Sequence, residues 1–388
     1  MCKPFRIILV LPLLFCFSPC SYALTNGGFV SGIISTAGEI HRYTFNASAG
    51  ESIQLSITGY IGMHIDLYYP DGTHFGPNSG VMIKSNLPQS GLYTVEVSAA
   101  ISSETGAYEL YYVKVPGANE KGLLNDSDMR SDTISDGDLD SYTFIANAGD
   151  SMQLSISGDI GMYIDLYFPD GSHFAGPNSS VIVKGSNSVT QSGTYTVVAR
   201  SSIPHEVGNY DLYYVKAPGA NEHGSLINGG VVSGNITPGD LDSYTFVANT
   251  GDSIQLSVSG DIGMYIYAYY PDGSLLAGPN SGVIMKGGNS ITQSGTYTVV
   301  ARSSTAHEAG NYQLAFNRTC SVPGDVAPVS GPDCEVNLAD YLVMLRIILG
   351  LYTATPQQIQ NGDLYPPGSG DSTINIQDLM LLQQIIFP

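Results

Sequence analysis

Positive charge is scarce in this sequence. Its 388 residues include 14 Lys and Arg but 34 Asp and Glu, which gives a formal net charge of −20. Proteins that hold nucleic acid neutralise its phosphates with clustered Lys and Arg, so this composition excludes nucleic acid as a partner. The acidity instead suits the binding of divalent cations, which prefer oxygen ligands.

Long apolar runs are also missing. The N-terminal apolar run, residues 7–17, is too short to cross a bilayer. It follows Lys3 and Arg6, and Ser21 and Ala23 offer small side chains at the −3 and −1 positions of a cleavage site. This is the pattern of a signal peptide over residues 1–23. We therefore expect a protein that is secreted and has no membrane span.

Cysteine is rare, and most of it is N-terminal. Of the five cysteines, Cys2, Cys16 and Cys20 belong to the predicted signal peptide, which leaves Cys320 and Cys334. A close pair in an exported protein predicts one disulfide. The alternative is two buried thiols that do not pair.

Enzyme motifs are absent from the sequence. It contains no Gly-x-Ser-x-Gly elbow, no His-Glu-x-x-His pair and no glycine-rich phosphate loop. The seven histidines are scattered and are not shared by all the repeats described below. We therefore expect no catalytic residues and no enzymatic activity.

What the sequence does contain is one module repeated three times, over residues 24–117, 118–219 and 220–318. Each copy has Tyr-Thr-Phe near its start and a Pro-Asp-Gly turn, and residues 191–202 recur unchanged as 293–304. The stretches 52–57, 151–156 and 253–258 alternate polar and apolar residues, which predicts strands with one buried face. Short strands without helical periodicity predict a mainly β fold of tandem β-sandwiches or jelly rolls.

These repeats resemble the bacterial pre-peptidase C-terminal domain family. The resemblance lies in residues 239–246 (Gly-Asp-Leu-Asp-Ser-Tyr-Thr-Phe), 251–252, 270–273, 295–299 and 310–312. The first module departs from it, with Gly-Glu-Ile-His-Arg at 38–42. The resemblance implies non-catalytic sandwiches of the kind appended to secreted peptidases and other extracellular enzymes. Such modules bind or position polymeric substrates, and some members bind calcium.

Two sets of sandwich residues are candidates for binding. Paired aspartates at a strand entry could share a calcium ion, or could cap a turn through hydrogen bonds to the backbone; they are Asp138 with Asp140 and Asp240 with Asp242. Tyrosines on the outer face of one strand could stack on sugar rings or contact a protein; they are Tyr163, Tyr167, Tyr265, Tyr267 and Tyr269. The alternative for the tyrosines is packing within the sheet or between modules. The absence of Trp counts against a strong carbohydrate platform.

The C-terminal segment, residues 319–388, carries a doubled acidic pattern. Each position in the second copy lies 38 residues after its partner, as from 325 to 363; the two sets are Asp325, Asp333, Asn337, Asp340 and Asp363, Asp371, Asn375, Asp378. The last three members of each set have the spacing of positions 5, 9 and 12 of an EF-hand loop, with Glu335 and Thr373 at position 7. Asp325 and Asp363 serve as position 1 if each loop accepts four extra residues. An apolar helical pattern follows each loop, so we predict a small all-α domain that binds two calcium ions. The alternative is a solvated acidic loop.

This segment resembles a dockerin-type domain, whose usual partner is a cohesin domain. The resemblance lies in residues 324–326, 333, 336–342, 362–364, 371 and 374–379. It implies calcium binding and docking on a protein. The sequence departs from the family in the four extra residues of each loop and at position 6, which is Cys334 and Ser372. It also departs at positions 10 and 11, which are Leu338-Ala339 and Ile376-Gln377. Recognition of cohesin therefore does not carry over residue by residue.

Three functions follow as hypotheses. The first is a secreted scaffold whose tail docks on a cohesin-like or other extracellular protein while its sandwiches bind a surface polymer, glycan or protein. The second is an accessory component of a secreted peptidase or polysaccharide-degrading hydrolase system. The third is an adhesive string with a calcium-bound cap at its end.

Overall fold

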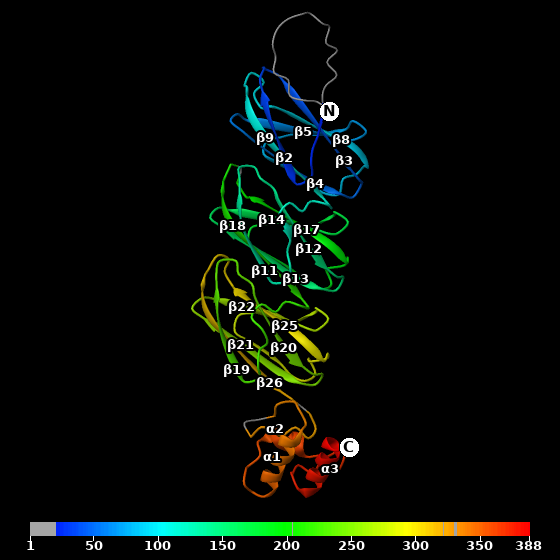
Figure 1. Ribbon diagram of the computed structural model, residues 1–388, viewed down its shortest axis with the longest axis vertical. Helices are drawn as coiled ribbons and strands as arrows, with labels where there is room; N and C mark the ends of the chain where they lie inside the picture. The colour runs from blue at the N-terminus through cyan, green and yellow to red at the C-terminus, as the bar shows by residue number, and fades with distance from the viewer. Residues whose placement is uncertain (1–20, 204, 321, 330–331) are drawn as a thin grey trace, which may run out of the picture.

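The computed structural model describes residues 21–203, 205–320, 322–329 and 332–388. Three β-sandwiches follow one another along the long axis, and a small helical domain ends the chain (Figure 1). The fold class predicted from the sequence is confirmed. Residues 1–20, which hold most of the predicted signal peptide, lie outside the described residues. Within the described residues, no helix is long and apolar enough to cross a membrane.

Each sandwich consists of two sheets, which we call its first and second sheet. In module 1 the first sheet has the order β1 (Tyr22–Ala23), β3 (Ile40–Ala47), β8 (Gly91–Ala99), β5 (Met63–Tyr68), β6 (His74–Asn78). Its second sheet has the order β2 (Gly28–Ile34), β9 (Gly106–Val115), β4 (Ser52–Gly59), β7 (Val81–Lys84).

Module 2 repeats this order, and module 3 repeats it without the short edge strand of the first sheet. In module 2 the first sheet is β10 (Gly122–Leu123), β12 (Asp140–Ala146), β17 (Gly193–Ser201), β14 (Met162–Tyr167), β15 (His173–Asn178), and the second is β11 (Asp128–Ile134), β18 (Gly208–Ala217), β13 (Ser151–Gly158), β16 (Val181–Lys184). In module 3 the first sheet is β20 (Asp242–Ala248), β25 (Gly295–Ser303), β22 (Met264–Tyr269), β23 (Leu275–Asn280), and the second is β19 (Gly230–Ile236), β26 (Gly310–Thr319), β21 (Ser253–Gly260), β24 (Val283–Lys286).

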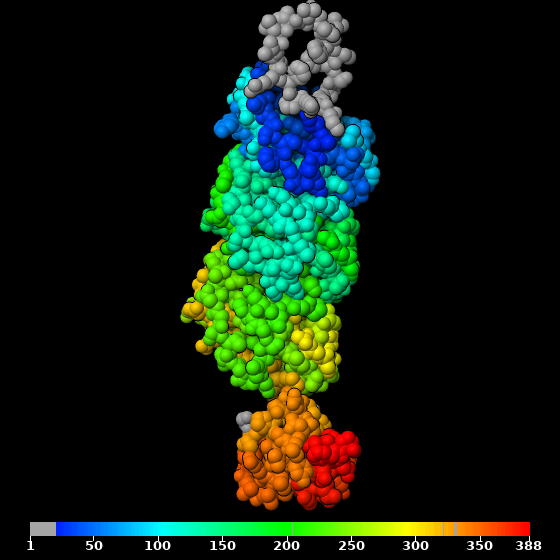
Figure 2. Space-filling model, viewed as in Figure 1, coloured from blue at the N-terminus to red at the C-terminus, as the bar shows by residue number. Residues whose placement is uncertain are grey.

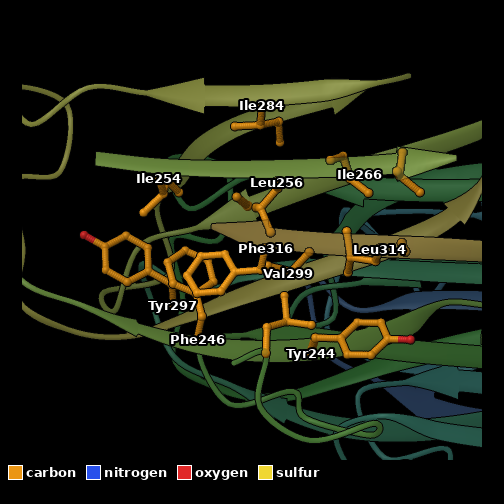
Figure 3. Close-up of a cluster of buried hydrophobic side chains, with 14 of the residues drawn as sticks. Tyr244, Phe246, Ile254, Leu256, Ile266, Ile284, Tyr297, Val299, Leu314 and Phe316 are labelled. Atoms are coloured by element: carbon orange, nitrogen blue, oxygen red, sulfur yellow. The ribbon is translucent and has the colours of Figure 1, made fainter. Parts of the chain in front are cut away.

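The core of each module lies between its two sheets. In module 3, Phe246 packs against Tyr297 and Phe316, with ring centroids 4.9 and 4.7 Å apart (Figure 3). Leu256 and Leu314 on the facing sheet are fully buried beside them. Alternate residues of each strand point inward, so the repeated Tyr-Thr-Phe segment supplies two aromatic core residues in every module.

Neighbouring modules bury a second apolar layer between them. The second sheet of one module packs on the first sheet of the next, so that Tyr111 and Val113 of β9 meet Tyr167 and Val198 of module 2. The equivalent junction between modules 2 and 3 buries residues Tyr213, Val215, Ala217, Tyr267, Tyr269 and Val300. Figure 2 shows the three sandwiches in close contact, whereas the helical domain joins the third through a narrower neck. The sandwiches therefore form a rod.

This packing corrects two predictions. Strands β4 and β13 are buried along almost their whole length, not on one face as their alternating sequence predicts. Gln54 and Gln153 lie in the junctions and donate to the hydroxyls of Tyr167 and Tyr269, at 2.8 and 2.9 Å. In β21, which no fourth module covers, burial alternates as expected.

The predicted tyrosine binding face is also corrected. Tyr167, Tyr267 and Tyr269 are at most 4% exposed because they lie in the junctions, so they cannot stack on an external sugar ring. Tyr163 and Tyr265 are partly exposed at the edge of this face, where the guanidinium groups of Arg200 and Arg302 lie 5.0 and 5.1 Å from their rings. The alternative of packing between modules holds for the three buried tyrosines.

The two ends of the rod lack this apolar surface. The position of Val198 in module 2, which lies in the junction, is occupied in module 1 by Glu96 on the outer face. Glu96 pairs with Arg42 at 2.7 Å. At the other end, the positions of the junction residues Tyr213 and Val215 of β18 are occupied in β26 of module 3 by Ala315 and Asn317. Terminal repeats with a polar outer face stop a stack of modules from extending. The sequence thus limits the rod to three sandwiches.

The helices in the described part of the chain all belong to the C-terminal domain. They are α1 (Leu338–Ile348), α2 (Pro356–Gly362) and α3 (Ile376–Ile386). Helices α1 and α3 were expected from the apolar pattern. Helix α2 was not, although Thr355, Pro356 and Gln358 form a capping box with Pro at the first turn, a signal that sequence reading could have used.

The packing at the junctions predicts that replacing two equivalent tyrosines will lower the free energy of unfolding by different amounts. Tyr167→Ala removes a buried ring and the partner of Gln54, so the free energy of unfolding should fall by about 3 kcal/mol. Tyr68→Ala, at the same position on the free face of module 1, should cost about 1 kcal/mol at most. Chemical denaturation followed by circular dichroism measures both. Equal losses would contradict the assignment of the junction.

Candidate metal centre

The two acidic loops of the C-terminal domain are held by the same hydrogen bonds. In loop 1 (residues 325–340), the carboxylate of Asp325 accepts from the backbone N–H of Asp333 and Cys334, at 3.3 and 2.7 Å. The carboxylate of Asp340 accepts from the N–H of Val326 and Ala327 through Oδ1, and from Asn337 through Oδ2, each at 2.7 Å. Asp325 and Asp340 are both fully buried. These two aspartates therefore close the loop from opposite ends.

Loop 2 (residues 363–378) repeats this arrangement contact by contact. Asp363 accepts from the N–H of Asp371 and Ser372, at 2.8 and 2.6 Å. Asp378 accepts from Leu364 and Tyr365 through Oδ1, both at 2.7 Å, and from Asn375 through Oδ2 at 2.8 Å. The shared spacing of the two sequences thus reflects a shared three-dimensional frame.

Backbone conformation at the sixth loop position is also shared. Cys334 and Ser372 have φ of 75° and 66°, in the left-handed region that ordinarily favours glycine. The EF-hand loop places glycine at its position 6 for the same sharp turn. Both loops therefore make the sharp turn of the EF-hand loop at this position, although neither residue is glycine.

The remaining predicted ligands lie at the mouths of the loops and at the helix starts. Asp333, Glu335, Asp371 and Thr373 are exposed, and the N–H groups of Glu335 and Thr373 donate to Asp333 and Asp371, both at 3.0 Å. Asn337 and Asn375 are the N-caps of α1 and α3, and the Oδ1 atom of each accepts a backbone N–H at 2.8 Å. Each loop thus leads directly into a capped helix.

The electrostatics of loop 1 favour a cation. Burial raises the pKa of Asp325 to about 7, with a further contribution from the charges of Asp340 and Asp333, although the N–H of Cys334 opposes it. Among the described residues, no Lys, Arg or His forms an ion pair with a carboxylate of either loop. Carboxylate and amide oxygens gathered without a basic partner are a donor set that fits Ca²⁺.

Asp340 and Asp378 hold the backbone of their loops through hydrogen bonds, in addition to their predicted role as metal ligands. Each Oδ1 already accepts two hydrogen bonds, so only the Oδ2 atoms retain a free lone pair. They are best described as residues that shape the loops and offer one further oxygen each. The sequence pattern alone does not show this second role.

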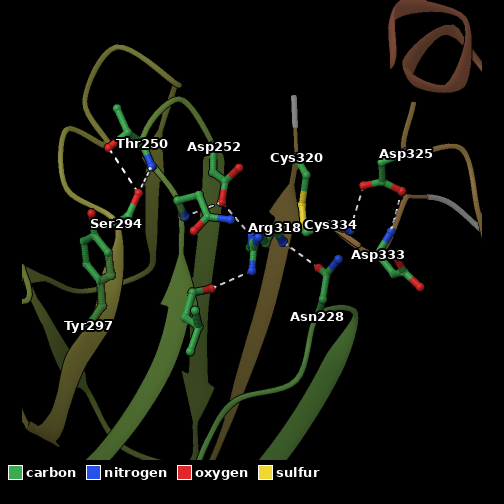
Figure 4. A network of polar contacts seen from close by, with 12 residues as sticks. Asn228, Thr250, Asp252, Ser294, Tyr297, Arg318, Cys320, Asp325, Asp333 and Cys334 are labelled. Atoms are coloured by element: carbon green, nitrogen blue, oxygen red, sulfur yellow. Dashed lines mark hydrogen bonds and ion pairs between the residues drawn. A yellow bond between two sulfur atoms is a disulfide. The ribbon is translucent and has the colours of Figure 1, made fainter. Parts of the chain in front are cut away.

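A disulfide joins loop 1 to the rod. Cys320, which follows β26, is bonded to Cys334, with Cα atoms 5.4 Å apart (Figure 4). The neighbouring Arg318 pairs with Asp252 at 2.7 Å, and its N–H donates to Asn228 at 2.6 Å. Gln357 and Asn361 of α2 donate to the carbonyl of Cys320, both at 3.0 Å. Helix α2, which sequence reading missed, thus helps to fix the neck.

The aspartate pairs of the sandwiches are engaged in other contacts. Asp138 and Asp240 accept from the N–H of Leu139 and Leu241 at 2.8 and 2.9 Å, which is the turn-capping alternative to calcium binding. Asp140 accepts from the hydroxyl of Tyr210 and lies 3.2 Å from the ammonium of Lys121. Burial raises the pKa of Asp140 to about 7, while the Tyr210 hydrogen bond opposes it.

The partner of Asp242 differs from that of Asp140. Asp242 accepts from Tyr312 and lies 2.9 Å from Nε2 of His223. In module 3 the two aspartates thus have different partners. In module 2, one carboxylate oxygen each of Asp138, Asp140 and Glu120 lies within 4.8 Å of the others, so a shared calcium site there stays a prediction.

Comparisons with known proteins identify no family. No protein-family model and no curated protein matches the chain. PliG, a periplasmic inhibitor of g-type lysozyme from Aeromonas hydrophila, is 20% identical with a TM-score of 0.22, over 24% of this chain and 95% of that one. The CUB1-EGF-CUB2 domain of human MASP-1/3 is 11% identical with a TM-score of 0.17, over 48% of this chain and 99% of that one. A triple jelly roll from an archaeal virus is 11% identical with a TM-score of 0.15, over 75% and 82%. Scores this low carry no argument about function.

Calcium titration of the full chain tests the loops. We expect two Ca²⁺ per chain by isothermal titration calorimetry, and one in each of Asp340→Ala and Asp378→Ala, because each change removes the closing carboxylate of one loop. Glu308→Ala, an exposed acid of module 3, serves as the control and should keep two sites. An unchanged stoichiometry in both loop variants would show that the ligands are assigned wrongly.

The disulfide predicts an asymmetry between the loops. Cys320→Ser with Cys334→Ser gives loop 1 the residue that loop 2 carries as Ser372, but removes the closed ring of about 15 residues. Such a ring contributes about 3 kcal/mol by the chain-entropy model, so the helical domain should lose stability by about that amount. Calorimetry should show weaker calcium binding at one site and an unchanged second site. Equal weakening of both would argue against a local role for the disulfide.

Proposed function

We propose that this chain is a secreted, non-catalytic, multimodular binding protein whose C-terminal domain binds two Ca²⁺ ions and docks on an extracellular protein. The observation that carries the proposal is the repeated loop frame, in which equivalent aspartates 38 residues apart make equivalent hydrogen bonds. Because the described carboxylates of these loops have no basic partner, a bound cation would balance their charge. When bound, calcium would stabilise the loops and, through their N-caps, helices α1 and α3.

The docking surface would lie on α1 and α3. Six apolar side chains on these helices and at their C-caps are at least half exposed, in pairs 38 residues apart; they are Leu338 with Ile376, Leu342 with Met380, and the C-caps Leu349 with Phe387. Apolar side chains that the domain core leaves uncovered, and that recur on both helices, are typical of an interaction surface. The loops and the surface share these helices, so calcium would order the surface that the partner reads.

A cohesin-type domain is the partner to which we commit. It follows from the dockerin resemblance of the loops, and the exposed apolar pair Leu338 and Ile376 occupies the tenth loop position. Family members read their partners near this position with hydroxyl groups, so the partner of this chain would present an apolar counterpart. The rod of sandwiches would hold this docking domain at a fixed distance from whatever the N-terminal modules bind.

The sandwiches would bind a polymer at the junction grooves rather than on the buried tyrosine face. A groove of about 600 Å³ beside the first junction is lined by module 1 residues that include Ile33, Tyr60 and Glu109, and by Asp136 of module 2. Tyr60 is 94% exposed. An exposed aromatic ring beside carboxylates is a combination that suits a sugar polymer, which offers both apolar ring faces and hydroxyl groups.

The docking proposal is tested with purified cohesin domains in biolayer interferometry. Binding should occur with Ca²⁺ and disappear with chelator. Leu342→Asp with Met380→Asp should abolish it while leaving two calcium sites, because both side chains are exposed and lie outside the loops. Ile227→Asp, an exposed apolar residue of module 3, is the control that should bind normally. Binding that survives chelator, or that the double variant retains, would refute the proposal.

A further inference from the structure

A histidine and two carboxylates converge where the chain enters module 3. Glu222 and His223 lie in the segment that joins module 2 to module 3, and Asp242 begins β20. The Nε2 atom of His223 is 2.9 Å from Oδ1 of Asp242 and 3.9 Å from Oε2 of Glu222. One ligand atom of each residue lies within 4.8 Å of the others. Asp242 is buried, whereas the side chains of Glu222 and His223 are 40% exposed, so an ion can enter from solvent.

In module 2, a positively charged side chain occupies the position that His223 occupies in module 3. The residue equivalent to His223 is Lys121, whose ammonium lies 3.2 Å from Asp140 and 3.1 Å from Asp132. A fixed cation therefore occupies the position beside the buried aspartate. Module 3 has Gly234 in place of Asp132, pairing with Tyr312 as Asp132 pairs with Tyr210. The lysine has thus been replaced by a side chain that can ligate a metal.

The spacing of the donor atoms suits a tetrahedral ion. Zinc binds imidazole nitrogen and carboxylate oxygen at about 2.0–2.2 Å, which places two tetrahedral ligands roughly 3.4 Å apart. The observed separations of 2.9 and 3.9 Å lie on either side of that value. Three protein ligands leave a fourth position for water.

A second layer of contacts holds the aspartate. The other oxygen of Asp242 accepts from the hydroxyl of Tyr312, which in turn bonds to Tyr244. The ring of His223 lies against Tyr244, with centroids 5.3 Å apart. Partners of this kind orient metal ligands and strengthen binding. Asp240 is committed to its own turn through Thr237 and Leu241, so it is not needed as a ligand.

We propose that Glu222, His223 and Asp242 form a binding site for a borderline divalent cation of the Zn²⁺ class, separate from the calcium loops. One imidazole and two carboxylates favour such an ion over Ca²⁺, which prefers oxygen ligands throughout. The bound ion would fasten the inter-module segment to β20. It would thereby stiffen the junction between modules 2 and 3, a role that Lys121 fills permanently one module earlier.

The test is a Zn²⁺ titration of the full, disulfide-bonded chain with the C-terminal loops saturated by excess Ca²⁺. The decisive variant is His223→Lys, which copies the residue that module 2 carries at this position and is therefore expected to fold. The wild type should bind one more Zn²⁺ per chain than H223K, and Zn²⁺ should raise the melting temperature of the wild type alone. Glu222→Gln should weaken this site at least tenfold.

Two outcomes would overturn the proposal. The first is the same Zn²⁺ stoichiometry and affinity in the wild type and H223K, which would place all the bound zinc elsewhere. The second is displacement of the extra Zn²⁺ by Ca²⁺ in a competition series, which would make the site one for a hard cation. Neither outcome bears on the calcium loops, because the calcium titration of the Asp340→Ala and Asp378→Ala variants tests those loops in a separate experiment.

Discussion

The contact between the second sheet of one sandwich and the first sheet of the next is the constraint on which the rod depends. It buries both faces of β4 and β13, and it places Gln54 and Gln153 where their amides must find partners. An unpaired polar group in such a layer would cost more free energy than a hydrogen bond returns. The tyrosine hydroxyls of β14 and β22 accept from the amide NH2 groups, whereas the Oε1 atoms of both glutamines are buried without a hydrogen-bond partner among the described residues. The junction is therefore polar as well as apolar, and Gln54 has a second acceptor in Asp165, at 3.1 Å.

The ends of the rod follow from the same constraint. A stack of identical modules would present an apolar face at each end and would associate further with other copies. Here Glu96 and Arg42 charge one end, and Ala315 and Asn317 remove the large apolar side chains from the other. The repeats are thus alike in their cores and different at their outer faces. Burial in β21 shows the consequence directly, since its pattern alternates where β4 and β13 are buried throughout.

Sequence reading succeeded where the signal is local and failed where it depends on a neighbour. The repeats, the strands and the Pro-Asp-Gly turns follow from short-range chemistry, and so do the two helices that start at Asn337 and Asn375. The alternation in residues 52–57 predicts a solvated face, but the next module covers it, and nothing within the segment reports that cover. The outward tyrosines were misassigned for the same reason. The double role of Asp340 was missed because its contacts with Val326 and Ala327 depend on how the loop closes, whereas helix α2 was missed despite a readable cap.

The two acidic loops are alike in chemistry but differ in attachment. Loop 1 carries Cys334 at the turn that Ser372 occupies in loop 2, and Cys334 is tied to the residue that follows β26. The N–H of Cys334 also donates to Asp325, so the same residue holds both the covalent link and one edge of the loop. Any rearrangement of loop 1 must therefore be transmitted to the end of module 3, where Arg318 is fixed by Asp252 and Asn228. Loop 2 has no disulfide in the described structure and is attached instead through α2, whose Gln357 and Asn361 donate to the carbonyl of Cys320. The two similar loops are thus attached to module 3 in different ways, loop 1 by a covalent bond and loop 2 by the hydrogen bonds of the helix that precedes it.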